Sequence, residues 1–81
     1  MTLAVYHGAY SIELVEDAEK RHLPAGVKLD NRKIIVGSGY FRVRKDHIVF
    51  YVDGKKPFTY PVNQIEFVRD DRNLVLWPQF N

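Results

Sequence analysis

Cysteine is absent from this 81-residue sequence, which excludes disulfide bonds, thiolate metal sites and a cysteine nucleophile. Long apolar runs are also missing, because no stretch approaches the roughly 20 residues that a membrane-spanning helix needs. The first residues, Met1–His7, have neither the basic start nor the long apolar core of a secretion signal. We therefore expect a cytoplasmic protein that does not associate with a membrane.

Sequence motifs of cofactor binding, metal binding or catalysis are scarce. The segment Gly37–Arg42 begins like a dinucleotide-binding fingerprint, but it lacks the third glycine and leads into a strand pattern instead of a helix. The histidines His7, His22 and His47 are isolated from one another and show no metal-ligand spacing. The pair Asp70–Asp71 lies between two arginines, where aspartate favours the geometry of a turn. We therefore predict no enzymatic activity, no metal site, no cofactor and no small-molecule ligand.

The composition is that of a folded chain with one modest core. Hydrophobic residues make up 46% and aromatic residues 14%, so we expect a single domain over residues 1–81. The net charge is only +2, but residues 1–26 carry −2, residues 27–63 carry +5 and residues 64–81 carry −1. The basic middle favours an anionic partner, although lysine and arginine also solvate ordinary exposed strands.

Apolar and polar residues alternate with a period of two between recurring turn residues. This pattern indicates a mainly β fold, or an α+β fold with one short helix. We expect a twisted antiparallel meander that forms a small SH3-like or OB-like barrel or half-barrel. One strand is predicted at Tyr10–Leu14, and a hairpin is predicted from Val27–Leu29 and Lys33–Val36 around Asn31–Arg32.

One helix is predicted, at Glu16–His22. Its acidic residues come early and its basic residues come late, as the helix dipole prefers. A competing interpretation extends the helix back to Ile12, with Ser11 as its N-cap, in place of the strand at Tyr10–Leu14. Both interpretations remain open from the sequence, and we favour the strand.

The segment Gly39–Val52 predicts a β-hairpin whose two faces differ chemically. Alternate residues of a strand point to opposite sides, so one side of this hairpin is apolar and the other is basic and aromatic. A single register satisfies both faces at once. With a two-residue loop at Lys45–Asp46, the predicted pairs are Tyr40 with Tyr51, Phe41 with Phe50, Arg42 with Val49, Val43 with Ile48 and Arg44 with His47.

Two more strand pairings are predicted after this hairpin. The turn at Asp53–Gly54 precedes a strand at Pro57–Pro61, and its two prolines favour the edge of the sheet. The strands Gln64–Arg69 and Asn73–Trp77 are joined by a polar turn at Asp70–Asp71. The predicted pairs are Phe58 with Phe50, Tyr60 with Ile48, Phe67 with Leu74 and Ile65 with Leu76.

Apolar residues fall on both faces of the last predicted strand. Three apolar residues lie outside the predicted core: Val75, Trp77 and, near the terminus, Phe80. We predict that they form the interface of a homodimer or larger homo-oligomer. The predicted core comprises Val5, Ile12, Leu14, Leu29, Ile34, Val36, Phe41, Val43, Ile48, Phe50, Phe58, Ile65, Phe67, Leu74 and Leu76.

The basic and aromatic side of the central hairpin is the best candidate for binding. Tyrosine and arginine are enriched where proteins bind each other, and the same side chains pair with phosphates and stack on unpaired bases. We therefore predict a non-catalytic binding module that is a protein-interaction or self-associating domain. The alternative is a β-domain that binds single-stranded nucleic acid. The predicted binding residues are Tyr40, Arg42, Arg44, Lys45, His47 and Tyr51.

Overall fold

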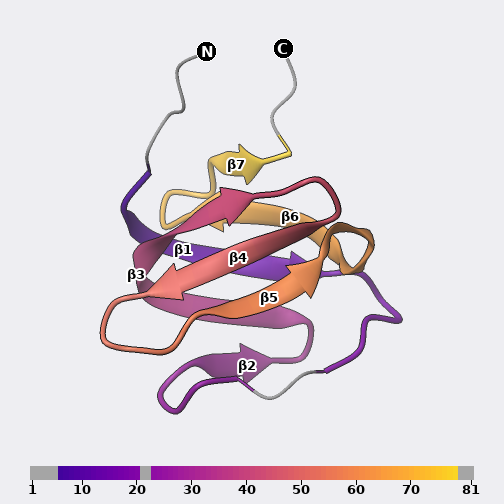
Figure 1. The fold of residues 1–81 in the computed structure, drawn as a ribbon. Helices are drawn as coiled ribbons and strands as arrows, with labels where there is room; N and C mark the ends of the chain where they lie inside the picture. Colours follow the sequence, from indigo (N-terminus) through magenta and orange to yellow (C-terminus); the bar gives the residue numbers. More distant parts are fainter. Residues whose placement is uncertain (1–5, 21–22, 79–81) are drawn as a thin grey trace.

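One antiparallel sheet contains all the strands of the computed structural model, which describes residues 6–20 and 23–78 (Figure 1). Its main path runs in the order β5-β4-β3-β1-β6-β7, and β2 pairs with β3 off this path. The fold is mainly β, as predicted, with β5 and β7 at the two ends of the path. The elements are β1 (Gly8–Leu14), β2 (Lys28–Asp30), β3 (Lys33–Val43), β4 (His47–Val52), β5 (Phe58–Pro61), the 3-10 helix η1 (Val62–Gln64), β6 (Ile65–Asp70) and β7 (Val75–Trp77).

The longest strand, β3, has different neighbours along its two halves. Residues 33–35 pair with β1 on one side and with β2 on the other, whereas residues 39–43 pair with β4. The register between β1 and β3 shifts where these halves meet, and such a bulge bends a strand. Glycine is required at position 39, because a Cβ there would overlap the carbonyl oxygen of Tyr51. The bend therefore lets one strand serve two parts of the sheet.

The predicted registers around the central hairpin are confirmed. The Arg44 N–H donates to the His47 carbonyl at 2.8 Å, which closes the hairpin at the expected loop. The strand β5 lies at an end of the sheet, as its prolines predicted. The observed pairs are Tyr40 with Tyr51, Phe41 with Phe50, Arg42 with Val49, Val43 with Ile48, Phe58 with Phe50, Tyr60 with Ile48 and Leu29 with Ile34.

The core lies on the inner side of this sheet and agrees in part with the predicted one. Of the predicted residues, those that are buried are Ile12, Leu14, Ile34, Val36, Ile48, Phe50 and Ile65. Those that pack against the core while partly buried are Leu29, Phe41, Phe58 and Leu76. Core residues that were not predicted are Tyr10, Val52, Tyr60 and Val68. Val5 lies outside the described residues.

Two predicted core residues are exposed. Val43 is 51% exposed, because it lies near the tip of the hairpin, beyond Gly39, the last residue of β3 that pairs with β1. Leu74 is 60% exposed, because it lies between the loop and the start of β7. Both positions continue the apolar alternation of a strand past the part of the sheet that covers the core.

The strand β6 departs from regular alternation, so its inward residues differ from the prediction. The register between β6 and β1 shifts at Glu66, which leaves this residue as an extra one in the strand. The inward side therefore continues from Ile65 to Val68, which is fully buried. Phe67 is only partly buried, and the guanidinium of Arg69 lies 4.1 Å from its ring centroid.

The turn between β6 and β7 is longer than the predicted turn at Asp70–Asp71. The loop is Asp71–Asn73, because the Asp70 N–H donates to the Leu74 carbonyl at 2.9 Å. Asn73 has a φ of 69°, the left-handed conformation that closes three-residue hairpin loops. The predicted pairs of Phe67 with Leu74 and of Ile65 with Leu76 are therefore wrong, and β7 instead pairs Val68 with Trp77 and Arg69 with Val75.

The segment 15–20 contains a turn and no helix. The prediction of a helix at Glu16–His22 is wrong as far as the structure describes it, and its last two residues lie outside the described residues. The Ala18 N–H donates to the Val15 carbonyl at 3.1 Å, which closes a turn, and the Val15 N–H donates to the Gln64 carbonyl at 3.0 Å. The competing helix from Ile12 is also wrong, because Ile12 lies in β1. Within the described ranges, no helix is long and apolar enough to cross a membrane.

Candidate binding face on the central hairpin

The outward side chains of β3 and β4 form one surface, which we call the hairpin face. Along β4, the residues Ile48, Phe50 and Val52 are buried, so the residues that alternate with them point outward. The register places each of these beside an outward residue of β3. The predicted binding residues on the two strands thus come together, and Lys45 lies in the loop that joins them. The hairpin face comprises Tyr40, Arg42, Arg44, Lys45, His47, Val49 and Tyr51.

Aromatic rings on the inner side support the hairpin face from below. The ring centroid of Phe50 lies 5.3 Å from that of Phe58 and 6.0 Å from that of Phe41. Tyr10 of β1 packs against the same rings, and its hydroxyl donates to the Tyr40 carbonyl at 3.0 Å. Burial raises the pKa of the Tyr10 hydroxyl, which keeps it protonated as a donor. The backbone beneath the hairpin face is therefore held by packing and by a buried hydrogen bond.

The two tyrosines of the hairpin face stack on each other. Their ring centroids are 4.6 Å apart and their planes differ by 12°. The ring of His7 lies 6.4 Å from that of Tyr40, and its Nε2 is 3.2 Å from Oδ1 of Asp53. The ring of Tyr51 therefore covers one face of Tyr40, whereas the ring of His7 is too distant and too tilted to stack on it. The pair therefore presents ring edges and hydroxyls, together with the ring face of Tyr51 that points away from Tyr40.

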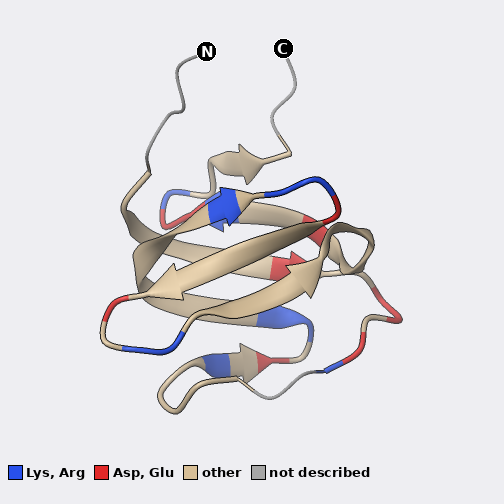
Figure 2. Cartoon of the chain, in the orientation of Figure 1, with Lys and Arg blue, Asp and Glu red and all other residues tan. Residues whose placement is uncertain are grey.

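Three cations of the hairpin face carry exposed charge. In Figure 2, basic residues occupy the end of β3 and the turn that follows it, with an acidic residue beyond them. Among the described residues, no carboxylate lies within ion-pair distance of Arg42, Arg44 or Lys45. The acidic residue of the turn, Asp46, is held by Nδ1 of His47 at 2.7 Å, and this hydrogen bond lowers the pKa of Asp46. The three cations can therefore pair with anions of a partner.

The residues of the predicted oligomer interface lie at the β7 end of the sheet, away from the hairpin face. Val75 is 43% exposed at the β7 end, whereas Trp77 is partly buried and packs against the core. Leu76 and Trp77 are neighbours in β7 and both pack against the core while partly buried, and the register between β6 and β7 is irregular. Phe80 lies outside the described residues.

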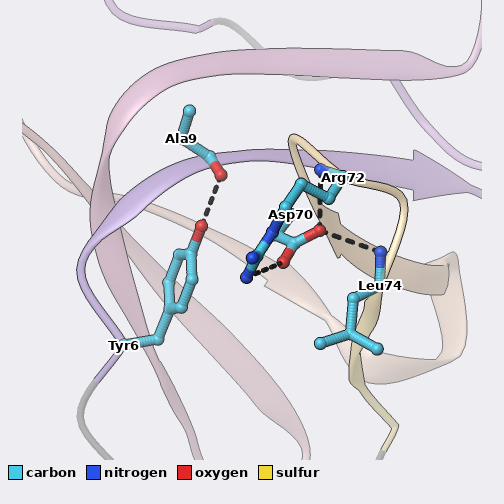
Figure 3. Close-up of polar contacts among 5 residues, drawn as sticks. All are labelled: Tyr6, Ala9, Asp70, Arg72 and Leu74. Atoms are coloured by element: carbon cyan, nitrogen blue, oxygen red, sulfur yellow. Dashed lines mark hydrogen bonds and ion pairs between the residues drawn. The ribbon is translucent and has the colours of Figure 1, made fainter.

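The carboxylate of Asp70 holds the turn before β7, and the sequence gave no signal that it is buried (Figure 3). Asp70 is 4% exposed, and its Oδ1 accepts hydrogen bonds from the backbone N–H of Leu74 at 2.8 Å and of Arg72 at 2.9 Å. The Leu74 hydrogen bond is the main cause that lowers the pKa of Asp70, and the Arg72 guanidinium adds to it. These bonds confirm that Asp70 serves the turn, in which an aspartate binds amides two and four residues ahead.

Tyr6 lies near this turn without bonding to Asp70. Its hydroxyl donates to the Ala9 carbonyl at 2.5 Å (Figure 3). Burial and then the negative charge of Asp70 raise the pKa of Tyr6. The hydroxyl of Tyr6 and the carboxylate of Asp70 therefore both bind backbone groups of their own chain.

One open groove of about 510 Å³ lies between residues 23–25 and residues 54–58. Leu23 and Phe58 contribute apolar lining, and Lys55 and Lys56 also line it. The sequence gave no signal for the groove, which depends on two loops distant in the chain. Within the described residues, no cluster of three histidine, aspartate or glutamate side chains could hold a metal ion.

Comparison of the chain with protein-family models, with curated proteins and with solved structures finds no match. The hairpin face is therefore the basis on which its function is proposed.

Proposed function

We propose that this protein is a small non-catalytic binding module that holds an acidic segment of a partner protein on the hairpin face. The observation that carries this proposal is the set of three exposed cations, Arg42, Arg44 and Lys45, which have no carboxylate partner among the described residues. They stand beside the stacked Tyr40–Tyr51 pair. Tyrosine and arginine together are the side chains that dominate the affinity of protein interfaces.

The stacked tyrosines favour a protein partner over single-stranded nucleic acid. Stacking of a base on a ring is worth about 1–3 kcal/mol, but it needs an open ring face. Tyr51 covers one ring face of Tyr40, so a base could stack on that face only after the two tyrosines separate. Separation would lose the roughly 0.5–1.5 kcal/mol of an aromatic pair. Ring edges and hydroxyls, in contrast, suit the carbonyls and carboxylates of a protein.

Single-stranded nucleic acid remains the second candidate because of one feature. Tyr51 keeps a ring face directed away from Tyr40, beside cations that could contact phosphates. One stacked base and a few phosphate contacts would produce binding that falls steeply with salt. A protein partner that also contacts the tyrosines would be released less steeply.

The fold proposal that accompanies this function is an SH3-like half-barrel. Strand β6 returns beside β1 directly after the 3-10 helix η1, while β3 bends so that its second half joins β4 and β5. Small barrels of this kind act as binding modules for both proteins and nucleic acids, so the fold alone does not choose between them. Self-association is a related possibility for the exposed Leu74 and Val75 at the β7 end.

Capture from cell extract with matched variants tests the proposed function. Arg42→Ala/Arg44→Ala removes two charges from the hairpin face, and Lys28→Ala/Lys33→Ala removes two exposed charges from the β2–β3 hairpin. We expect the wild type and the lysine variant to retain the same protein after nuclease treatment and at raised salt, and the arginine variant to lose it. Both variants should keep stability within about 0.5 kcal/mol per substitution, as surface changes usually do.

Two results would redirect or end this proposal. Loss of the retained material on nuclease treatment, with a steep dependence on salt, would assign the hairpin face to nucleic acid. Equal retention by both variants would show that the arginines of the hairpin face do not bind the partner.

A further inference from the structure

Strand β3 extends past its neighbour β1. Pairing between β1 and β3 ends at Gly8 opposite Gly39, whereas pairing between β3 and β4 continues to Val43 opposite Ile48. The part of β3 at residues 40–43 therefore has a paired strand on the β4 side only, within the described residues. This part of β3 also carries Arg42 and Tyr40 of the hairpin face.

Hydrogen bonds show which backbone groups of this segment point away from β4. The Arg44 N–H donates to the His47 carbonyl, and the Ser38 carbonyl accepts from the Asp53 N–H at 3.0 Å. Residues of even number in this part of β3 thus bond to the β4 side, because bonded residues alternate along an antiparallel pair. Phe41 and Val43 therefore point their N–H and C=O groups outward, where residues 6–20 and 23–78 supply no backbone partner.

The other long edge of the sheet is closed to an added strand. On β4, the Asp46 carbonyl accepts from the Val62 N–H at 3.0 Å, so the residues of even number face β5. The outward positions around β5 are then Pro57, Thr59 and Pro61, and the two prolines have no N–H to donate. Prolines on an edge strand prevent unwanted pairing with another strand. Phe41 and Val43, in contrast, keep the N–H groups that such pairing needs.

We infer that an extended segment of the partner protein adds to the sheet as a strand beside Phe41–Val43. This inference rests on the proposed function and names its binding mode. The N–H and C=O groups of Phe41 and Val43 would bond to the backbone of the segment, as in other cases of strand addition. A segment residue opposite Arg42 shares the hairpin face and carries a carboxylate. A residue opposite Val43, which is 51% exposed, lies on the other side and is apolar.

A proline at position 43 tests the binding mode, because it would remove an outward N–H from the edge, as Pro57 and Pro61 do around β5. Val43→Pro removes an outward N–H that β4 does not use, and Arg42 before it already has the extended backbone that proline requires. Val43→Thr is the matched control, since it keeps the N–H and the β-branched shape. Circular dichroism and thermal unfolding should show that both variants fold.

The probe is a labelled eight-residue peptide in which glutamate alternates with valine or threonine, and fluorescence anisotropy measures its binding. We expect Val43→Pro to weaken binding by about tenfold or more, since it loses a backbone hydrogen bond and adds a ring at the edge. Val43→Thr should stay within about threefold. Arg42→Ala/Arg44→Ala should also weaken binding, and a peptide with lysine in place of glutamate should not bind.

Failure of the binding mode and failure of the function give different results. If Val43→Pro binds as the wild type does while the arginine variant loses binding, strand addition is wrong and the proposed function stands. If both variants bind as the wild type does, or the wild type does not bind the peptide, both are wrong. A dimer that sedimentation detects and that Val43→Pro abolishes would make a second copy the occupant, which overturns the assignment to a partner.

Should Val43→Pro fail to fold, hydrogen exchange in the wild type gives the answer. Saturating peptide should slow exchange at the amides of Phe41 and Val43 more than at Tyr40 and Arg42, which already bond to β4. Unchanged exchange at Phe41 and Val43 in the bound protein would overturn strand addition.

Discussion

The two halves of β3 carry the same alternation of residues and have opposite roles. In the first half, Ile34 and Val36 are buried, and residues 33–35 lie between β1 and β2. In the second half, Val43 is half exposed and only β4 is paired. The bulge before Gly39 shifts the phase, so even-numbered side chains face the core in the first half and odd-numbered ones in the second. Apolar and polar residues still alternate within each half, so the neighbours of each half decide what it does. One half stabilises the fold, and the other is available for binding.

Substitution of one apolar residue in each half should give the largest contrast. Ile34→Ala should destabilise the protein by about 2–5 kcal/mol, because a fully buried side chain leaves a cavity. Val43→Ala should stay within about 0.5 kcal/mol, because its side chain is already in contact with water. Urea unfolding of the two variants measures both values. Equal losses would mean that the second half of β3 belongs to the core.

The junction between the halves should show a smaller but specific effect. A Cβ at Gly39 would overlap the Tyr51 carbonyl oxygen, so Gly39→Ala should cost about 1–3 kcal/mol as the strands move apart. A Cβ on Gly37 would have no atom within 4 Å of it, so Gly37→Ala should be neutral or stabilising by up to about 1 kcal/mol. Thermal unfolding compares them, and a neutral Gly39→Ala would contradict the close approach of β3 to β4.

Asp70 extends the comparison to the opposite end of the sheet, where the expected effect is a change with pH. Its pKa is lower in the folded protein, chiefly because of the Leu74 N–H, so the stabilisation is present above the unfolded pKa of about 4 and is lost as pH falls through the folded pKa. Asp70→Asn should lower stability at neutral pH and reduce the loss of stability in acid. Peptide binding at the hairpin face should be unchanged.

Asp71→Asn is the control for this experiment, since it removes the same charge from an exposed neighbour. Unfolding curves at several pH values from 7 downwards, at about half-unit intervals, would separate the two variants. Identical pH profiles for Asp70→Asn and the wild type would show that the turn bonds of Asp70 contribute no pH-dependent stability.

Sequence alternation predicted the parts of the fold in which strands are regular. It placed Phe41 opposite Phe50 and Tyr40 opposite Tyr51, because one register satisfied both faces of the hairpin. It failed in β6, where the extra residue Glu66 changes the phase of the strand. A bulge of this kind depends on the partner strand, so the local pattern does not contain it. The helix expected at Glu16–His22 failed although its charge order suited a helix, because a segment of about two turns is only marginally stable as a helix.

The candidate site was predictable as a set of positions and not as a geometry. The register brought Arg42, Arg44 and Tyr51 to one side of the hairpin, as their spacing indicates. Stacking of the two tyrosines and the bond between His47 and Asp46 depend on side-chain orientation, which spacing does not determine. The outward backbone groups of Val43 became visible only when the end of β1 was known.

Amide hydrogen exchange of the free protein, followed by NMR, tests most directly whether the two halves of β3 differ. In the first half, β3 has a paired strand on each side, β1 and β2. The backbone amides of Ile34 and Ile35 point to opposite sides and should therefore both exchange slowly. In the second half, Tyr40 and Arg42 should exchange slowly while Phe41 and Val43 exchange rapidly, since only one side is paired. Slow exchange at Phe41 and Val43 in the free monomer would show that this edge is already covered and would contradict the account.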